Sequence, residues 1–87
     1  MEIFLDDETG YAEWIAAHAP GWVLNVPRQG TSVAIVLHSA SCRSISGAFT
    51  NYTTTDYYKI CAHDQDPLIA WADVQPQTLQ RCGRCQP

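Results

Sequence analysis

The stretch Arg81-Cys82-Gly83-Arg84-Cys85-Gln86, near the carboxyl terminus, decides how this chain folds. Two cysteines separated by two residues form a tight turn, or knuckle, that can present two thiolates to one metal ion. The glycine between them suits the backbone turn that such a knuckle needs. The sequence therefore predicts that this stretch binds a metal ion together with ligands from another part of the chain.

The second half of the predicted site lies upstream, directly after the apolar run of residues 33–37. His38 and Cys42 flank the short segment Ser39-Ala40-Ser41, so both side chains can converge on one ion. With the knuckle they give the pattern His-x3-Cys followed by Cys-x2-Cys, a set of soft ligands suited to tetrahedral Zn²⁺. The predicted ligands of this structural zinc site are His38, Cys42, Cys82 and Cys85.

A fifth residue competes for the fourth position. Cys61 stands at the end of the apolar run of residues 57–62. It is either a small buried hydrophobic residue or an alternative metal ligand in place of His38. Both possibilities stay open at the level of the sequence.

The chain has 87 residues, 46% of them hydrophobic, which predicts one globular domain over residues 1–87. Domains of this size bury proportionately little surface, so a metal often stabilises them. Structural zinc contributes roughly 10–16 kcal/mol of apparent binding free energy, against about 5–15 kcal/mol for the whole stability of a domain. A fold that contains this zinc is expected to depend on it.

The four cysteines also permit two disulfides. The first residues, Met1 to Asp7, are too short and too acidic for a secretory signal, and no apolar run approaches the roughly 20 residues of a membrane span. A cytoplasmic location is therefore expected, and there thiols stay reduced and favour metal binding over disulfides.

Charge is distributed unevenly along the chain. The net charge of −4 argues against nucleic-acid binding by bulk electrostatics. Five of the nine acidic residues lie within the first 13 positions, whereas three of the five basic residues stand next to metal-site cysteines in sequence. A basic rim at the metal site is predicted, and the candidate nucleic-acid contacts are Arg43, Lys59, Arg81 and Arg84.

Periodicity and turn residues predict an α+β fold, with a small mixed or antiparallel sheet and two short helices closed by the zinc site. Asp7 or Thr9 can cap the first helix, which Pro20-Gly21 ends, and Asp66 can cap a second helix from Pro67 to about Val74. A turn over residues 27–30 makes a hairpin of two of the strands, and residues 44–56 are expected to form a loop. Strands are expected at residues 3–5, 22–26, 32–37 and 57–62.

The motifs His38-x3-Cys42-Arg43 and Arg81-Cys82-x2-Cys85-Gln86-Pro87 resemble the N-terminal zinc domain of the Ada-type DNA repair methyltransferases. That domain carries Cys-x3-Cys-Arg early and Arg-Pro-Cys-x2-Cys-x-Pro at its end. The resemblance covers roughly residues 33–87, in spacing and order more than in identity. It implies an α+β fold with one zinc on four cysteines, and transfer of a methyl group from a DNA phosphotriester to the first cysteine. Many small bacterial relatives carry the same end motif without that activity.

This chain has His38 at the position of the methyl-accepting cysteine. Four thiolates on Zn²⁺ leave a net charge of −2, which makes one sulfur a strong nucleophile, whereas three thiolates and a neutral imidazole leave −1. A zinc-bound imidazole nitrogen also has no lone pair with which to attack a methyl carbon. The four-thiolate site returns only if Cys61 is the fourth ligand.

The sequence therefore predicts a non-catalytic zinc module that contacts nucleic acid through the basic rim. One alternative is a protein-interaction module whose contact surface is the acidic first helix. Another is a zinc-thiolate alkyl acceptor. The aromatic residues expected on the protein-interaction surface are Tyr11, Trp22, Tyr52 and Tyr57.

Overall fold

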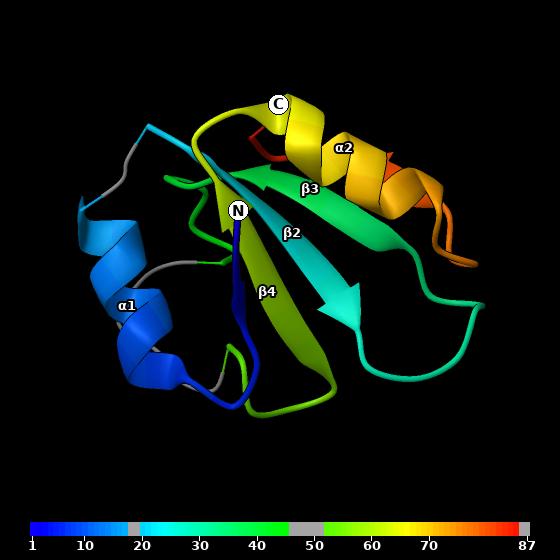
Figure 1. The fold of residues 1–87 in the computed structure, drawn as a ribbon, viewed down its shortest axis with the longest axis horizontal. Helices are drawn as coiled ribbons and strands as arrows, with labels where there is room; N and C mark the ends of the chain where they lie inside the picture. Colours follow the sequence, from blue (N-terminus) through cyan, green and yellow to red (C-terminus); the bar gives the residue numbers. More distant parts are fainter. Residues whose placement is uncertain (18–19, 46–51, 86–87) are drawn as a thin grey trace.

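The computed structural model describes residues 1–17, 20–45 and 52–85, so the middle of the expected 44–56 loop and the terminal Gln86-Pro87 lie outside the described residues. The described chain is α+β, as the sequence predicts, with two helices and a five-stranded mixed sheet (Figure 1). In chain order the elements are β1 (Glu2–Phe4), α1 (Glu8–Ala17), β2 (Trp22–Pro27), β3 (Ile35–Ser39), β4 (Tyr57–Ala62), α2 (Gln65–Asp73) and β5 (Leu79–Arg81).

The strand order in the sheet is β1-β4-β2-β3-β5. β2 and β3 form the predicted antiparallel hairpin, with Leu24 opposite Leu37, and Gly30 in the connection adopts a φ of +82° that suits glycine. β4 pairs antiparallel with both β2 and β1. The remaining pair, β3 with β5, is parallel, and this pairing brings the carboxyl end of the chain beside the end of β3.

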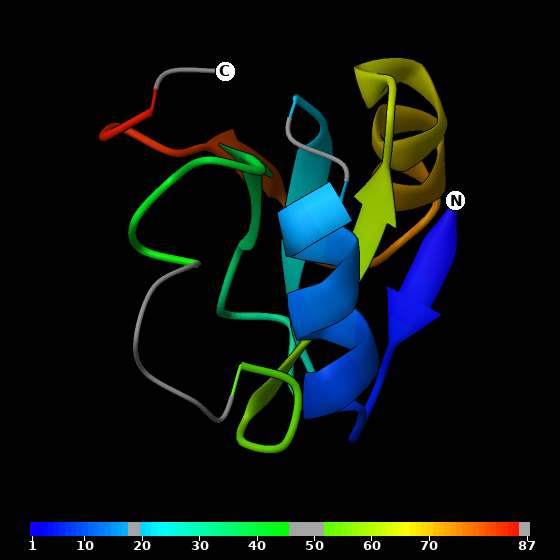
Figure 2. The same cartoon turned by 90° about the vertical axis from the view of Figure 1, so that its left-hand side faces the viewer.

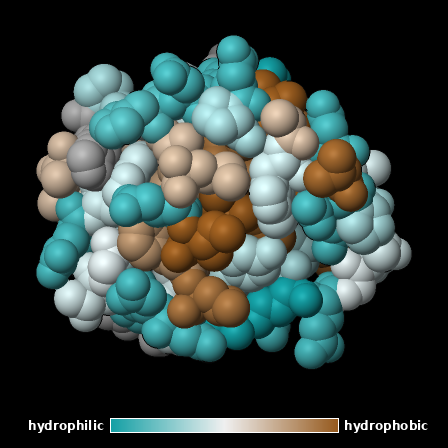
Figure 3. Space-filling view, viewed as in Figure 1, coloured by the Kyte–Doolittle hydropathy of each residue, from teal (hydrophilic) through white to brown (hydrophobic). Residues whose placement is uncertain are grey.

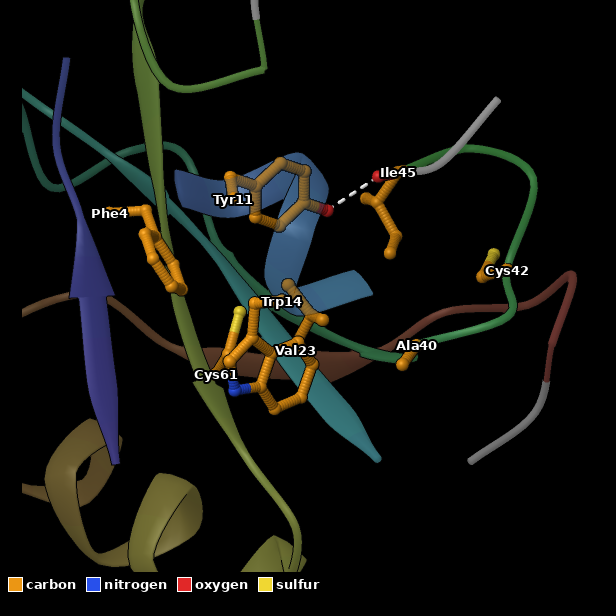
Figure 4. Packing of buried hydrophobic residues seen from close by; sticks show 8 residues of the cluster. All are labelled: Phe4, Tyr11, Trp14, Val23, Ala40, Cys42, Ile45 and Cys61. Carbon is orange, nitrogen blue, oxygen red and sulfur yellow. Dashed lines mark hydrogen bonds between the residues drawn. The ribbon is translucent and has the colours of Figure 1, made fainter. Parts of the chain in front are cut away.

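The sheet is covered on both faces, because successive side chains of a strand point to opposite sides. Leu24, Leu37 and Ile60 point to one face and pack with Leu68 and Ala72 of α2. The other face carries a second buried cluster beneath α1, which contains Phe4, Tyr11, Trp14, Val23, Ala40, Cys42, Ile45 and Cys61 (Figure 4). Figure 1 shows α1 and α2 on opposite sides of the strands.

Asp7, one of the two capping residues that the sequence predicts, fixes the start of α1. Its carboxylate oxygen Oδ1 accepts the backbone N–H of Gly10 at 2.8 Å, which satisfies one of the free donors of the first helical turn. The Tyr11 hydroxyl then donates to the carbonyl oxygen of Ile45 (Figure 4), so α1 is tied to the segment that follows β3.

The second helix begins earlier than predicted. It starts at Gln65 rather than Pro67, so Asp66 lies in its first turn and does not cap it. The N-cap residue is Asp64, whose side chain makes no capping hydrogen bond. Pro67 is still compatible with this position, because a first-turn residue needs no backbone N–H within the helix.

Candidate metal centre

The parallel pairing of β3 and β5 brings the two halves of the site together. Leu37 of β3 lies opposite Arg81 of β5, and the Cys82 N–H donates to the Leu37 carbonyl oxygen at 2.9 Å. His38 follows Leu37 on β3, and the chain reaches Cys42 in the next turn. Figure 2 shows the red carboxyl-terminal segment beside the green segment that follows β3.

The four predicted ligands form one compact group. The ligand atoms of His38, Cys42, Cys82 and Cys85 all lie within 4.8 Å of one another, and the Sγ atoms of Cys42 and Cys82 are 3.9 Å apart. Two sulfurs at 2.3 Å from a tetrahedral zinc ion are separated by about 3.8 Å. None of the four cysteines of the chain forms a disulfide. This group could therefore hold a metal ion, and its donor atoms suit a soft tetrahedral one.

Backbone N–H groups surround the knuckle sulfurs. Ser39 donates to Cys85 Sγ at 3.3 Å and Arg84 to Cys82 Sγ at 3.4 Å. Backbone hydrogen bonds from Cys85 and Arg84 lower the pKa of Cys82 to about 7, whereas burial raises the pKa of Cys85 to about 11. One thiolate is thus favoured by the protein itself, and a bound cation would favour the others.

The sequence predicts that the turn of the knuckle needs glycine at Gly83, but the structure does not require glycine there. Its φ is not positive, and a Cβ added there would meet no atom within 4 Å. The backbone of the knuckle is therefore one that other residues can also adopt.

His38 is presented as a neutral imidazole. Only 6% of the residue is exposed, and burial, together with the charge of Lys59, lowers the pKa of His38 to about 4. The neutral form is the one that binds metals. Ser44 Oγ lies 3.3 Å from His38 Nδ1 and 3.0 Å from Cys42 Sγ, so it contacts two of the four residues. Ser44 was not predicted from the sequence, in which its only signal is a hydroxyl residue two positions after Cys42.

Cys61 lies apart from the metal-ligand group. It is fully buried beneath α1, among Tyr11, Trp14 and Val23 (Figure 4). Burial raises the pKa of the Cys61 thiol to about 12, which favours the neutral thiol. Of the two candidates for the fourth ligand, the structure places His38 in the group, and Cys61 packs as a small hydrophobic residue.

The structure brings only part of the expected basic rim to the metal centre. Arg43 and Arg84 are exposed and line a pocket of about 280 Å³ together with Cys42 and Cys85. Arg81 is also exposed and donates to Gln65 Oε1 of α2 at 3.1 Å. Lys59 is absent from this rim, because it points from β4 into the protein and is 3% exposed.

The aromatic residues expected to contact a protein partner are buried or only partly exposed. Tyr11 is buried in the core, and Trp22, Tyr52 and Tyr57 are only partly exposed. Glu8 of the acidic helix α1 faces the segment of residues 52–54 and accepts hydrogen bonds from it. This side of α1 is therefore occupied by the protein's own chain.

The fold and the four side chains define a small α+β domain with a candidate His-Cys₃ metal centre. No family model matches the chain, and neither the curated proteins nor the solved structures compared with it give a match. Among the described residues, no helix combines the length and apolar character needed to cross a membrane.

Proposed function

We propose that this chain is a non-catalytic zinc-binding module in which the ion is structural. The observation that carries this proposal is the convergence of His38, Cys42, Cys82 and Cys85 within 4.8 Å. Four protein ligands complete a tetrahedron, which is the arrangement of structural zinc sites, whereas catalytic sites keep one position open for water or substrate.

The position of the site in the fold supports a structural role. β5 is a three-residue strand at the edge of the sheet, and only Leu79 of its residues is even partly buried. Such a short strand supplies little stability by itself. A zinc ion shared with His38 and Cys42 would fix the end of β5 to the end of β3.

Metal analysis of purified protein tests this proposal. We expect one zinc ion per chain by native mass spectrometry, and its loss in Cys82→Ser and in His38→Ala. Cys61→Ser is the matched control, because it makes the same chemical change outside the group and should retain the ion. Zinc loss in Cys61→Ser with retention in His38→Ala would reverse the assignment.

We further propose that the exposed arginines beside the metal contact the phosphates of nucleic acid. The support is local: Arg43 and Arg84 flank one pocket at the end of the sheet, and Arg81 lies on the strand that leads to it. Arginine donates two parallel hydrogen bonds to a phosphate group. With a net charge of −4, binding is expected to be weak and dependent on these few side chains.

Fluorescence anisotropy with a labelled DNA duplex at low salt tests the contact. Arg43→Gln and Arg84→Gln should each weaken binding and reduce the salt slope by about 1, as expected for one lost phosphate contact. Arg28→Gln removes the same charge at the opposite end of β2, where Arg28 pairs with Asp6 at 2.6 Å, and should leave binding unchanged. If all three substitutions weaken binding equally, the arginines beside the metal centre are not a specific site of phosphate contact.

The resemblance to Ada-type zinc domains supports the same module without its repair reaction. His38 belongs to the ligand group and Cys61 does not, so the group offers three thiolates and an imidazole. We therefore expect mass spectrometry to detect no added methyl group after incubation with DNA that carries methyl phosphotriesters. A methyl group on Cys42, Cys82 or Cys85 would overturn this part of the proposal.

A second candidate function, contact with a protein partner, rests on the edge strand β1. Figure 3 shows apolar side chains gathered over this strand, where Met1, Ile3 and Leu5 are at least half exposed. Edge strands with exposed apolar residues are typical sites of association. Sedimentation of the protein and of Ile3→Lys tests self-association at this edge. If both proteins are monomeric, self-association through β1 is rejected.

A further inference from the structure

A second pocket lies next to the metal centre, under the segments that flank residues 46–51. It has a volume of about 370 Å³, within the range of small-molecule sites. Its floor is one row of side chains across three strands, because Lys59 of β4 lies opposite Asn25 of β2, which lies opposite Val36 of β3. His38 and Ile45 belong to the wall toward the metal centre, and Tyr52 and Tyr57 to the remaining wall.

Lys59 is the unusual residue of this pocket. Its ammonium group donates to Asn25 Oδ1 at 2.6 Å and to the Tyr52 carbonyl oxygen at 2.8 Å, and lies 5.9 Å from the centre of the Tyr52 ring. Both hydrogen-bond acceptors are neutral. Among the described residues, no carboxylate forms an ion pair with Lys59. A buried ammonium without a carboxylate partner is costly to maintain.

Glu8 is the acidic residue whose charge acts most on Lys59, but its carboxylate forms no ion pair with the Lys59 ammonium. Its carboxylate accepts the N–H groups of Tyr52 and Thr53 at 2.9 and 2.6 Å, and the hydroxyls of Thr53 and Thr54 as well. The Tyr52–Thr53 backbone thus has Glu8 on its N–H groups and Lys59 on the Tyr52 carbonyl. Burial lowers the pKa of Lys59 to about 8, and the charge of Glu8 only partly opposes this effect. At neutral pH the side chain is therefore still a cation.

We propose that this pocket binds a small organic carboxylate, whose carboxylate group pairs with Lys59 and whose apolar body contacts Val36, Ile45 and Tyr57. An ammonium has three donors, and Asn25 and Tyr52 take two of them, which leaves one N–H for the ligand. A charge-assisted hydrogen bond in a partly buried site is among the stronger polar contacts. This site is distinct from the arginine rim and requires no nucleic acid.

Amide chemical shifts of the zinc-loaded, ¹⁵N-labelled protein, titrated with sodium benzoate at constant ionic strength, test the proposal. We expect saturable shifts at the amides of Val36, Tyr57 and Lys59, with a Kd of about 1 mM or below. Benzamide has the same shape without the charge and should cause no saturable shift. Equal responses to benzoate and benzamide would overturn the proposal, because they would show binding that ignores Lys59.

Two variants test the charge of Lys59 and the free volume of the pocket separately. Lys59→Met should weaken benzoate binding at least tenfold, and Val36→Phe should do so by filling the pocket while Lys59 remains. Val33→Phe, at an exposed position outside the pocket, is the control and should bind as the parent does. The dispersion of the amide spectrum verifies the fold of each variant.

Unchanged benzoate binding in both Lys59→Met and Val36→Phe would reject the site. Inorganic phosphate distinguishes a ligand with an apolar body from a bare anion. Phosphate binding as tight as that of benzoate, and unaffected by Val36→Phe, would likewise contradict the proposal, because the apolar wall would then contribute nothing.

Discussion

At the scale of single residues, the same face of β4 carries two ionisable groups on which burial acts in opposite directions. Lys59 and Cys61 are two positions apart, and both are almost completely buried. Burial disfavours the charged form of each, so it lowers the pKa of Lys59 to about 8 and raises that of Cys61 to about 12. Near neutral pH the Lys59 ammonium keeps its charge and the Cys61 thiol is neutral. Lys59 accordingly lines a pocket, and Cys61 packs in the hydrophobic core.

Lys59→Met should change how the free energy of unfolding depends on pH. The native state loses the Lys59 proton near pH 8 and the unfolded state only near 10.5, so between these values the unfolded chain binds more protons. The parent's stability should therefore rise relative to Lys59→Met over this window, by at most about 3 kcal/mol. Urea unfolding of both proteins from pH 7 to 10.5 measures the difference, in which the cysteine contributions cancel. A constant difference would show that Lys59 is not buried as a cation.

Among the secondary-structure elements, the pairing of strands far apart in the sequence decided two points that the sequence left open, the existence of β5 and the identity of the fourth candidate ligand. Apolar runs of strand-forming residues, bounded by turn residues, predicted four of the strands. Asp7, one of the two capping residues predicted, was correct because capping is local. β5 was not predicted, since Leu79-Gln80-Arg81 carries almost no apolar signal and pairs only because β3 offers it an edge. The choice between His38 and Cys61 depended on this pairing. His38 follows one apolar run and Cys61 stands at the end of another. The strand order distinguishes them, because β5 pairs with β3, whereas β2 and β3 lie between β5 and β4.

Glu8 shows how one helix can hold a distant segment in place. Burial by itself would raise the pKa of Glu8, but hydrogen bonds from residues 52–54 outweigh it and leave the pKa lowered. Glu8→Gln should reduce the free energy of unfolding by about 1–3 kcal/mol, because an amide cannot accept all of these donors. The reduction should be complete above the ordinary pKa of 4.5 and should diminish as the pH falls below it. Urea titrations measure it, with the exposed Glu13→Gln as control; equal losses in both variants would refute the role of Glu8.

At the scale of the whole molecule, the candidate metal centre lies at one edge of a sheet whose two faces carry separate hydrophobic clusters. Cys42 belongs to the cluster under α1, and Cys82 and Cys85 pack against it, so the metal site connects the carboxyl-terminal segment to that core. The cluster under α2 includes Leu79 of β5 at its margin. Loss of the ion is therefore expected to loosen β5 and, through it, the packing on both faces of the sheet.

Removal of zinc with a chelator should release β5 and lower the overall stability. We expect the Cys82 amide, which donates to the Leu37 carbonyl, to exchange with solvent at least 100-fold faster, since the packing of Leu79 and the hydrogen bond from Arg81 to Gln65 hold this short edge strand less firmly than the metal would. The melting temperature should fall by more than about 20 °C, because several kcal/mol of zinc binding correspond to about 4–8 °C each in a domain of this size. Hydrogen exchange and calorimetry measure the two effects. Added Zn²⁺ should reverse both and Mg²⁺ neither, because Mg²⁺ prefers oxygen ligands. An unchanged melting temperature after complete removal of the metal would show that the hydrophobic clusters alone maintain the fold.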